Sequence, residues 1–225
     1  MTIQGLTDAR RTLGSAVLGP EEITAALGSD PLAGLTAEDR ARIERVPFDG
    51  AALEAARGAG EMLVLRVARL ESAPLTLLSL GARLSGALDP RVHRGVGYSL
   101  RDEWTIDTQP FANTETCVTG WFLVHQRPLP ATCNRLYRAQ DAVLASLAGD
   151  NGRPRRRSAI EIAYDTLLWH RARGARLLAD AWDWSRTPSS DQGFVAVGEF
   201  GEAGLGVVAY SRAVRFGSLG VCPQR

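Results

Sequence analysis

The fold is decided in residues 158–174, which read SAIEIAYDTLLWHRARG. Ser158 followed by Glu161 is a capping box, in which the serine oxygen accepts from the third amide of a helix and the glutamate accepts from the cap amide. Apolar side chains then recur at the spacing of one helix face: Ile160, Ala163, Tyr164, Leu167 and Leu168. Gly174 stands where the left-handed C-cap of such a helix falls. The stretch therefore predicts a well-defined helix with one buried face.

Short strands separated by glycines follow this helix. Trp182-Asp183-Trp184 predicts extended backbone with both indoles on one face, because strand side chains alternate with period two. Residues 193–200 and 205–210 predict an antiparallel hairpin, and residues 217–222 predict a third short strand pinned into the same sheet. We therefore expect an α+β fold that ends in an antiparallel β-meander packed on the capped helix.

Weaker patterns organise the rest of the chain. Helices are predicted at 51–58, 75–84 and 134–147, and strands at 62–67 and 120–125. Residues 1–47 read as short helices broken by glycine and proline, which indicates a helical appendage or dimerisation arm. Residues 48–225 then form the α+β domain, with a mixed centre and an internal linker at 149–157. Residues 89–119 lose periodicity, and long irregular stretches are often functional.

Composition excludes several classes of protein. The 225 residues carry 26 basic and 25 acidic side chains, so the net charge of +1 supplies no field that draws the chain to nucleic acid or membrane. Every basic residue is arginine, which removes lysine Schiff-base chemistry and the phosphate-binding lysine of P-loop enzymes. No export signal or long apolar segment is visible, so the expected compartment is the cytoplasm.

One pairing of a nucleophile with a base can be named. Cys117 and His125 lie on either side of Gly120, and a cysteine beside a base is activated as a thiolate. Asp107 or Glu115 would orient the histidine. The pattern predicts a cysteine-dependent acyl-transfer or hydrolytic enzyme, and the alternative is a buried thiol near an incidental histidine. The histidines are isolated in the sequence, so no metal site is expected, and no cofactor is expected either.

A second candidate surface lies in the predicted meander. Trp182 and Trp184 could stack on a sugar ring, a base or a partner's apolar side chain, or they could pack as core against the capped helix. Arg212 and Arg215, in the loop between the last two strands, could clamp a carboxylate or phosphate by bidentate hydrogen bonds, or could remain solvated. These four residues form the binding site that the sequence predicts.

A run of arginines stands just before Ser158. Arg155, Arg156 and Arg157 add positive charge where a helix N-terminus is already positive, so a phosphate or an acidic partner would compensate them. An exposed linker whose charges are screened by salt explains the run as well. The three side chains are therefore a candidate anion-binding site.

The last fifth of the chain also resembles known folds. Trp182-Asp183-Trp184, the glycines between 193 and 206 and the block Gly217-Ser218-Leu219-Gly220-Val221 resemble the tails of uncharacterised bacterial domain families. With Arg212 and Arg215, they are distantly similar to the end of C-type-lectin-like folds, which close with a tryptophan-bearing strand, an Arg/Ser loop and a glycine-apolar strand. The calcium-binding clusters of true lectins are not evident in the sequence, and fold likeness alone does not establish function.

Three functions are open on these grounds. The first is a non-catalytic domain that recognises a small-molecule ligand or a protein partner through its tryptophans and loop arginines. The second is the cysteine-dependent enzyme that uses Cys117 and His125. The third is a scaffold that assembles, for instance as a homo-oligomer, through residues 1–47 and the arginine run.

Overall fold

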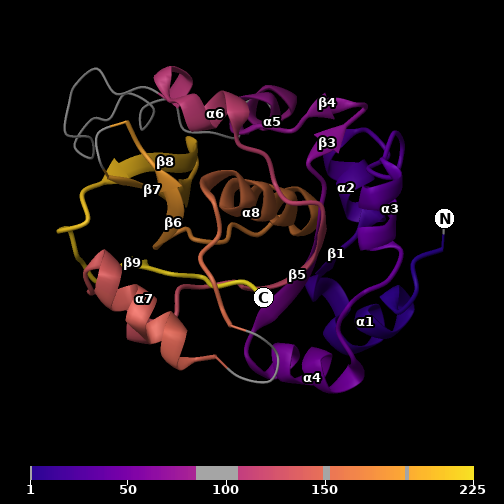
Figure 1. The fold of residues 1–225 in the computed structure, drawn as a ribbon, viewed down its shortest axis with the longest axis horizontal. Helices are drawn as coiled ribbons and strands as arrows, with labels where there is room; N and C mark the ends of the chain where they lie inside the picture. Colours follow the sequence, from indigo (N-terminus) through magenta and orange to yellow (C-terminus); the bar gives the residue numbers. More distant parts are fainter. Residues whose placement is uncertain (1, 85–105, 149–152, 191–192) are drawn as a thin grey trace.

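A computed structural model describes residues 2–84, 106–148, 153–190 and 193–225 (Figure 1). Its α-helices are α1 (Leu6–Leu13), α2 (Pro20–Leu27), α3 (Ala37–Ile43), α4 (Gly50–Gly58), α5 (Leu77–Arg83), α6 (Pro110–Thr114), α7 (Tyr137–Ser146) and α8 (Ala159–Arg173). Its strands are β1 (Val17–Leu18), β2 (Glu61–Arg66), β3 (Arg69–Leu70), β4 (Ala73–Pro74), β5 (Gly120–His125), β6 (Trp182–Pro188), β7 (Phe194–Gly201), β8 (Gly204–Tyr210) and β9 (Leu219–Gly220). The predicted α+β class is confirmed.

Two main sheets organise these elements. In the first sheet, β2 lies between β1, to which it is parallel, and β5, to which it is antiparallel. In the second sheet the order is β8-β7-β6-β9, and β6, β7 and β8 form the predicted antiparallel meander. β9 differs from the prediction, since it pairs in parallel with β6 at the opposite edge from β8. Residues 211–218 carry the chain back across the meander before β9 pairs.

The last residues of the chain join the two sheets. The backbone of Gln224 exchanges two hydrogen bonds with Arg155, at 3.0 and 2.9 Å. The backbone of Arg225 exchanges two with Leu123 of β5, at 3.0 Å each. The segment that pairs with β6 through β9 therefore becomes a neighbour of β5 a few residues later, and its end lies near the middle of the molecule in Figure 1.

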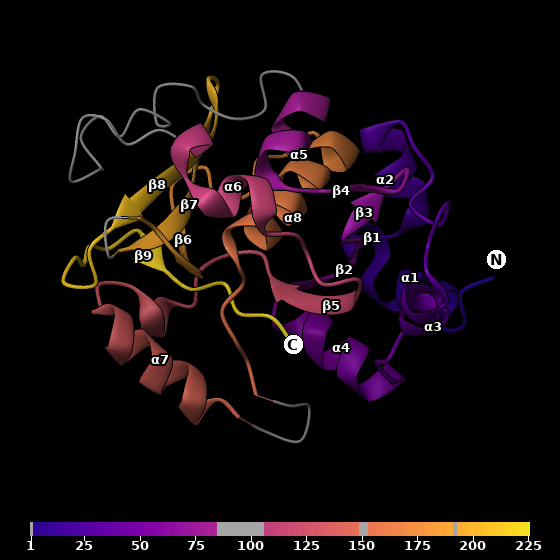
Figure 2. The ribbon, with the colours of Figure 1, turned by 45° about the horizontal axis from the view of Figure 1, so that its top comes forward.

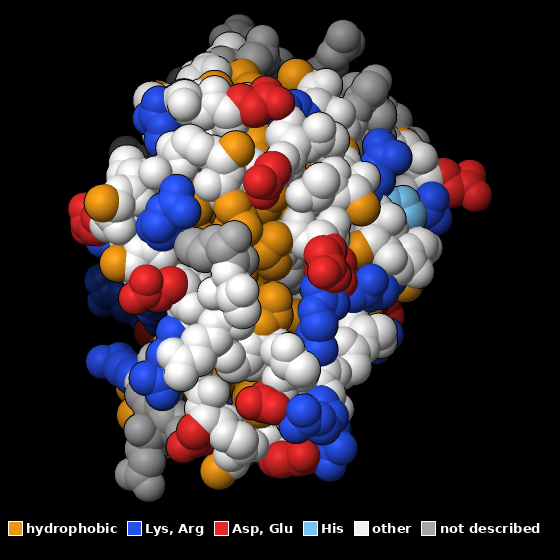
Figure 3. All heavy atoms as spheres, turned by 90° about the vertical axis from the view of Figure 1, so that its right-hand side faces the viewer, with side chains coloured by type: hydrophobic (Ala, Val, Ile, Leu, Met, Phe, Trp, Pro, Cys, Tyr) orange, Lys and Arg blue, Asp and Glu red, His pale blue; other side chains and the backbone are white. Residues whose placement is uncertain are grey.

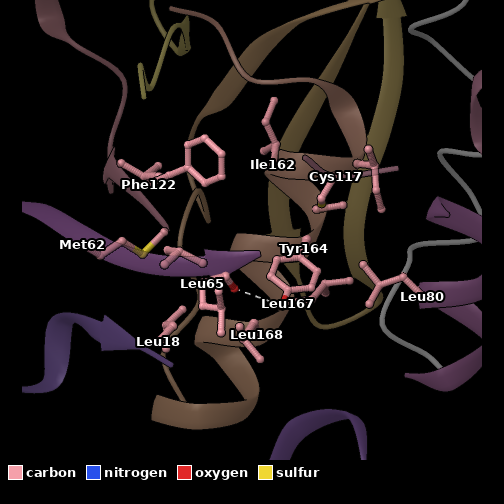
Figure 4. Close-up of a cluster of buried hydrophobic side chains, with 14 of the residues drawn as sticks. Leu18, Met62, Leu65, Leu80, Cys117, Phe122, Ile162, Tyr164, Leu167 and Leu168 are labelled. Carbon is pink, nitrogen blue, oxygen red and sulfur yellow. Dashed lines mark hydrogen bonds between the residues drawn. The ribbon is translucent and has the colours of Figure 1, made fainter. Parts of the chain in front are cut away.

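The central helix is α8, and its residues 159–168 are buried on every side. The capping box is present as predicted, because Ser158 Oγ accepts from the Glu161 amide at 3.3 Å and the Glu161 carboxylate accepts from the Ser158 amide at 2.7 Å. Figure 4 shows Tyr164 beside β2, where its hydroxyl donates to the Leu65 carbonyl at 3.2 Å. The sequence predicts one buried face, whereas α2, α5 and both sheets enclose this helix all round.

The second sheet is covered on both faces, with α8 and α7 on opposite sides (Figure 2). Val195 and Val197 point into the core shared with α8, while Trp182 and Trp184 point the other way, toward Tyr137 of α7. The predicted period-two alternation is therefore confirmed. The side of the sheet that carries both indoles is the one on which α7 packs, and not an open surface.

Residues 1–47 are an integral part of the domain, contrary to the predicted appendage. β1 pairs with β2, and Trp121 of β5 donates its indole N–H to the Ile43 carbonyl at 3.0 Å. Residues 1–47 contribute to the same core as α8 the side chains of Ile3, Ala9, Leu13, Val17, Leu18, Ile23, Leu27, Ile43 and Val46. Figure 3 shows the side at which α1, α2 and α3 lie, where charged side chains of both signs surround a narrow hydrophobic band. The sequence does not predict this burial, because the apolar residues of this region are scattered singly over short helices.

The predicted linker at 149–157 is tied to the domain in its described part, although the side chains of Arg153 and Arg155 are exposed. Arg155 is bridged to Gln224, and Arg156 and Arg157 are buried. Residues 149–152 lie outside the described residues, as do residues 85–105, which include much of the irregular stretch predicted at 89–119. Within the described remainder of that stretch, α6 packs against α5.

Candidate functional site

An open cavity of about 820 Å³ lies between the end of β5 and the starts of β6 and β9. We call it the β5–β6 cavity. Its walls come from four separate parts of the chain: residues 59–60, residues 125–130 with Cys133, residues 177–178 and 180–181, and residues 217–218. Most of the lining is apolar, and the leucines and prolines include Leu129, Leu177 and Pro130.

Backbone hydrogen bonds hold the walls of this cavity in place. The Leu129 amide donates to the Val221 carbonyl at 2.9 Å, and the Trp182 amide donates to the Ser218 carbonyl at 2.8 Å. The Leu178 carbonyl accepts from the Phe200 amide at 3.1 Å, although Leu178 has a φ of 57°, a left-handed conformation that is costly for leucine. These hydrogen bonds tie the cavity walls to the sheets.

Few ionisable groups line the cavity, and His125 is the one that the fold orients. Its Nε2 lies 3.1 Å from Glu61 Oε1, and Arg225 binds the same carboxylate at 2.8 Å. Burial opposes ionisation of Glu61, but the hydrogen bonds from His125 and Arg225 outweigh it and hold its pKa below the usual value. Arg127 and Asp180 supply the other charges of the lining.

The three cysteines differ in their access to the cavity. Cys117 and Cys222 are buried, whereas Cys133 is partly exposed and lines the β5–β6 cavity. Burial raises the pKa of the Cys133 thiol, and its Sγ lies 3.6 Å from the Leu129 carbonyl, to which it donates. Cys133 is thus a protonated thiol at neutral pH. Because it lines the cavity, the rate at which it reacts with a thiol reagent depends on how open the cavity is.

The structure does not bring Cys117 and His125 together. His125 ends β5 beside Glu61, whereas Cys117 precedes the other end of the strand, where its charge neighbours are Arg66 and Glu161. The six residues of β5 span about 17 Å. Burial also raises the pKa of the Cys117 thiol well above its usual value, and Arg66 does not overcome this. The predicted dyad is wrong, because the strand separates its members. Glu115 bonds Thr187 instead, at 2.7 Å.

The predicted meander surface is also divided. Trp182 and Trp184 are fully buried, so the stacking role is wrong and the alternative of core packing is confirmed, although the indoles pack on the α7 side of the sheet and not against the capped helix. Trp184 meets the Tyr137 ring at 5.0 Å between centroids. Arg212 and Arg215 are exposed as expected. The Arg212 guanidinium lies over the Phe194 ring at 4.7 Å, while the indoles lie beneath the surface, so the four residues do not share one open face.

Two of the three candidate anion-binding arginines are occupied by groups of the chain itself. Arg157 binds Asp165 at 2.6 Å and Asp183 at 2.8 Å. Arg156 binds Asp141 at 2.7 Å and donates to the Trp184 carbonyl at 2.8 Å. The assignment of these two as free anion donors is therefore corrected, whereas Arg155 remains exposed.

A buried ionic cluster surrounds Arg157 and was not predicted. Arg66 of β2 makes a bidentate contact with Asp165, and it also reaches Glu161 at 3.5 Å and Gln224. The sequence signal is the four-residue spacing of Glu161 and Asp165, which puts these two carboxylates at one side of α8, with Arg157 just before the Ser158 cap. Arg66 and Asp183 come from distant strands, so spacing could not have found them.

Neither a metal-binding cluster nor a membrane-spanning helix is found among the described residues. Over residues 2–84, 106–148, 153–190 and 193–225, no three histidine, cysteine, aspartate or glutamate side chains gather where they could hold a metal ion. Across those same stretches, no helix combines the length and the apolar character that crossing a bilayer requires.

Comparison with known proteins identifies no relative of this chain. No protein-family model, curated protein or solved structure matches the chain. The similarity of the last fifth to the end of C-type-lectin-like folds therefore stays a prediction.

Proposed function

We propose that this chain is a non-catalytic binding protein that takes up a small, mainly apolar ligand in the β5–β6 cavity. The observation that carries the proposal is the cavity itself, because about 820 Å³ lies within the roughly 300–1,000 Å³ typical of small-molecule sites. Its lining is mainly apolar with a few convergent polar groups, which is the composition of such sites. Its anchored walls support the proposal too, because little ordering is required on binding.

The polar groups of the cavity would orient such a ligand. His125 is fixed by Glu61 and would hydrogen-bond a polar end of the ligand, while Leu129 and Leu177 would cover its apolar part. The thiol of Cys133, whose pKa is raised by burial, favours binding over nucleophilic chemistry at neutral pH. Recognition remains the class of function that we favour, at a site that shares His125 with the predicted site residues but none of the predicted tryptophans and arginines. The cytoplasmic compartment stays a prediction.

A fluorescent apolar probe tests the cavity directly. We expect 1-anilinonaphthalene-8-sulfonate to bind the native protein saturably, with one probe for each chain. Ala59→Trp places a large side chain at the cavity wall and should weaken this binding by about tenfold. Ala51→Trp on the exposed face of α4 is the matched control and should leave it unchanged.

Alkylation of Cys133 by iodoacetamide gives a second readout, followed by mass spectrometry. Cys133 should react faster than Cys117 and Cys222, and bound probe should slow it severalfold. Probe binding that is not saturable, or that Ala59→Trp and Ala51→Trp affect equally, would contradict the proposal.

A further inference from the structure

A separate open groove of about 630 Å³ lies elsewhere on the molecule. Four arginines line it, Arg153, Arg155, Arg156 and Arg186, together with Tyr137 and Asp141 of α7. We call it the arginine groove. It shares no lining residue with the β5–β6 cavity, so a ligand of this groove would be a second one, independent of the proposed function.

One of the four arginines is already satisfied. Arg156 is buried and binds Asp141 at 2.7 Å, the Trp184 carbonyl at 2.8 Å and the Tyr137 carbonyl at 2.9 Å. The charges of Arg156 and Asp141 therefore cancel within the wall of the groove. Arg156 shapes the groove and has little capacity left to bind a ligand.

The other three guanidinium groups leave the groove positively charged. Arg186 is half exposed, and Glu161 and Glu115 offset part of its charge, the nearer of them in a long ion pair of 3.5 Å. Arg153 and Arg155 are exposed, and in the part of the chain that the structure describes no carboxylate lies within ion-pair distance of either. Like charges gathered around one hollow attract an anion.

Two of these arginines stand on anchored backbone. Arg155 is bonded to Gln224 in both directions, and its guanidinium lies 5.9 Å from the Phe122 ring centroid. Arg186 lies in β6, and its amide donates to the Arg157 carbonyl at 2.9 Å. A donor on a fixed backbone loses less conformational freedom when it binds an anion.

We propose that the arginine groove binds a small phosphorylated compound, a phosphate ester or diphosphate, through Arg153, Arg155 and Arg186. The planar guanidinium group matches phosphate oxygens in bidentate geometry. Val118, which is 44% exposed, and Leu144 supply an apolar wall for the organic part of such a compound. The net charge of +1 supplies no overall field that draws the chain to nucleic acid.

Titration calorimetry with inorganic pyrophosphate at low ionic strength tests this site. The intact chain should bind one pyrophosphate saturably, and Arg155→Gln with Arg186→Gln should weaken binding by about tenfold or more. Arg212→Gln with Arg215→Gln removes the same charge from the exposed loop 211–216 and should change the affinity less than about twofold.

The proposal would be overturned by no saturable binding of pyrophosphate, by equal weakening in both double variants, or by tighter binding of a short oligothymidine than of pyrophosphate. The last would indicate a nucleic-acid groove. Circular dichroism checks that each variant folds. Should the glutamine variant fold poorly, Arg155→Lys with Arg186→Lys replaces it, because lysine keeps the charge but loses the bidentate geometry. An unchanged affinity in that variant would also count against the proposal.

Discussion

Asp165 is the residue on which the buried charges converge. It accepts hydrogen bonds from Arg66 and Arg157, and it lies in the buried part of α8. A buried carboxylate without partners would protonate or destabilise the fold, so these two arginines explain how an acidic residue lies within the core.

Asp165→Asn should lower the free energy of unfolding by about 3–5 kcal/mol, because it leaves two buried guanidinium groups short of an anionic partner. Urea denaturation measures the change. Asp8→Asn breaks an exposed ion pair with Arg11 and should cost less than about 1 kcal/mol. Similar losses in both variants would contradict the role given to the buried cluster.

Glu22 should make stability depend on pH in the acid range. Burial opposes its ionisation, but the hydrogen bonds from Arg10 and the Gly19 amide outweigh it and lower its pKa from 4.5 to about 2. A lowered pKa in the folded state stabilises the fold above the unfolded pKa, and this stabilisation is lost as the pH falls from about 4.5 toward 2. After allowance for solvent screening it amounts to about 1–2 kcal/mol.

The comparison of Glu22→Gln with the native chain measures this contribution. The variant should be less stable at pH 6, and its difference from the native chain should shrink as the pH falls to 2. Glu21→Gln, at an exposed neighbour on the same helix, is the control and should show little difference at either pH. A constant difference for Glu22→Gln across the range would refute the assignment.

At the scale of elements, the second sheet depends on a close approach between β7, β8 and the Trp182 indole. Gly198 and Gly206 face each other in the strand register. A Cβ on Gly206 would lie 2.7 Å from the Trp182 ring and from the Gly198 carbonyl oxygen. Glycine at this point therefore leaves the room that the Trp182 indole occupies against the strand.

Gly206→Ala should lower the free energy of unfolding by about 2–3 kcal/mol, because the added methyl group overpacks this contact. Thermal unfolding followed by tryptophan fluorescence measures the effect, since Trp182 lies at the clash. Gly58→Ala in α4 meets no atom within 4 Å and should be neutral or stabilising by up to about 1 kcal/mol. A neutral Gly206→Ala would show that the strands can separate at no cost.

At the scale of the whole molecule, the two ends of the chain complete the first sheet. β1 forms one side of it, and the backbone of Arg225 pairs with β5 on the other. Both cavities are built from segments far apart in the sequence, so they exist only once this assembly is complete. Binding at either site should consequently stabilise the whole fold.

Removal of residues 1–47 should abolish cooperative unfolding, because it strips one strand and many core side chains from the first sheet. Circular dichroism during heating measures the transition. Removal of residues 1–2 alone, before the first core residue Ile3, should leave it intact. If the chain without residues 1–47 still unfolded cooperatively and only its elution in size-exclusion chromatography changed, the interpretation of residues 1–47 as a dimerisation arm would be supported instead.

Local rules in the sequence determined several elements of this protein. The Ser158–Glu161 capping box and Gly174 mark both ends of α8, and the alternation around Trp182 and Trp184 places both indoles on one face. These features depend on neighbours within a few residues, which a sequence displays directly.

Only the tertiary structure decided which other parts of the chain those elements contact. α7 covers the indoles, Arg66 and Asp183 neutralise the charges around α8, and four distant segments enclose the β5–β6 cavity. Each of these contacts joins residues far apart in the chain. Their free energy comes from burial and charge pairing that exist only when the two sheets have met, so spacing along the sequence carries no record of them.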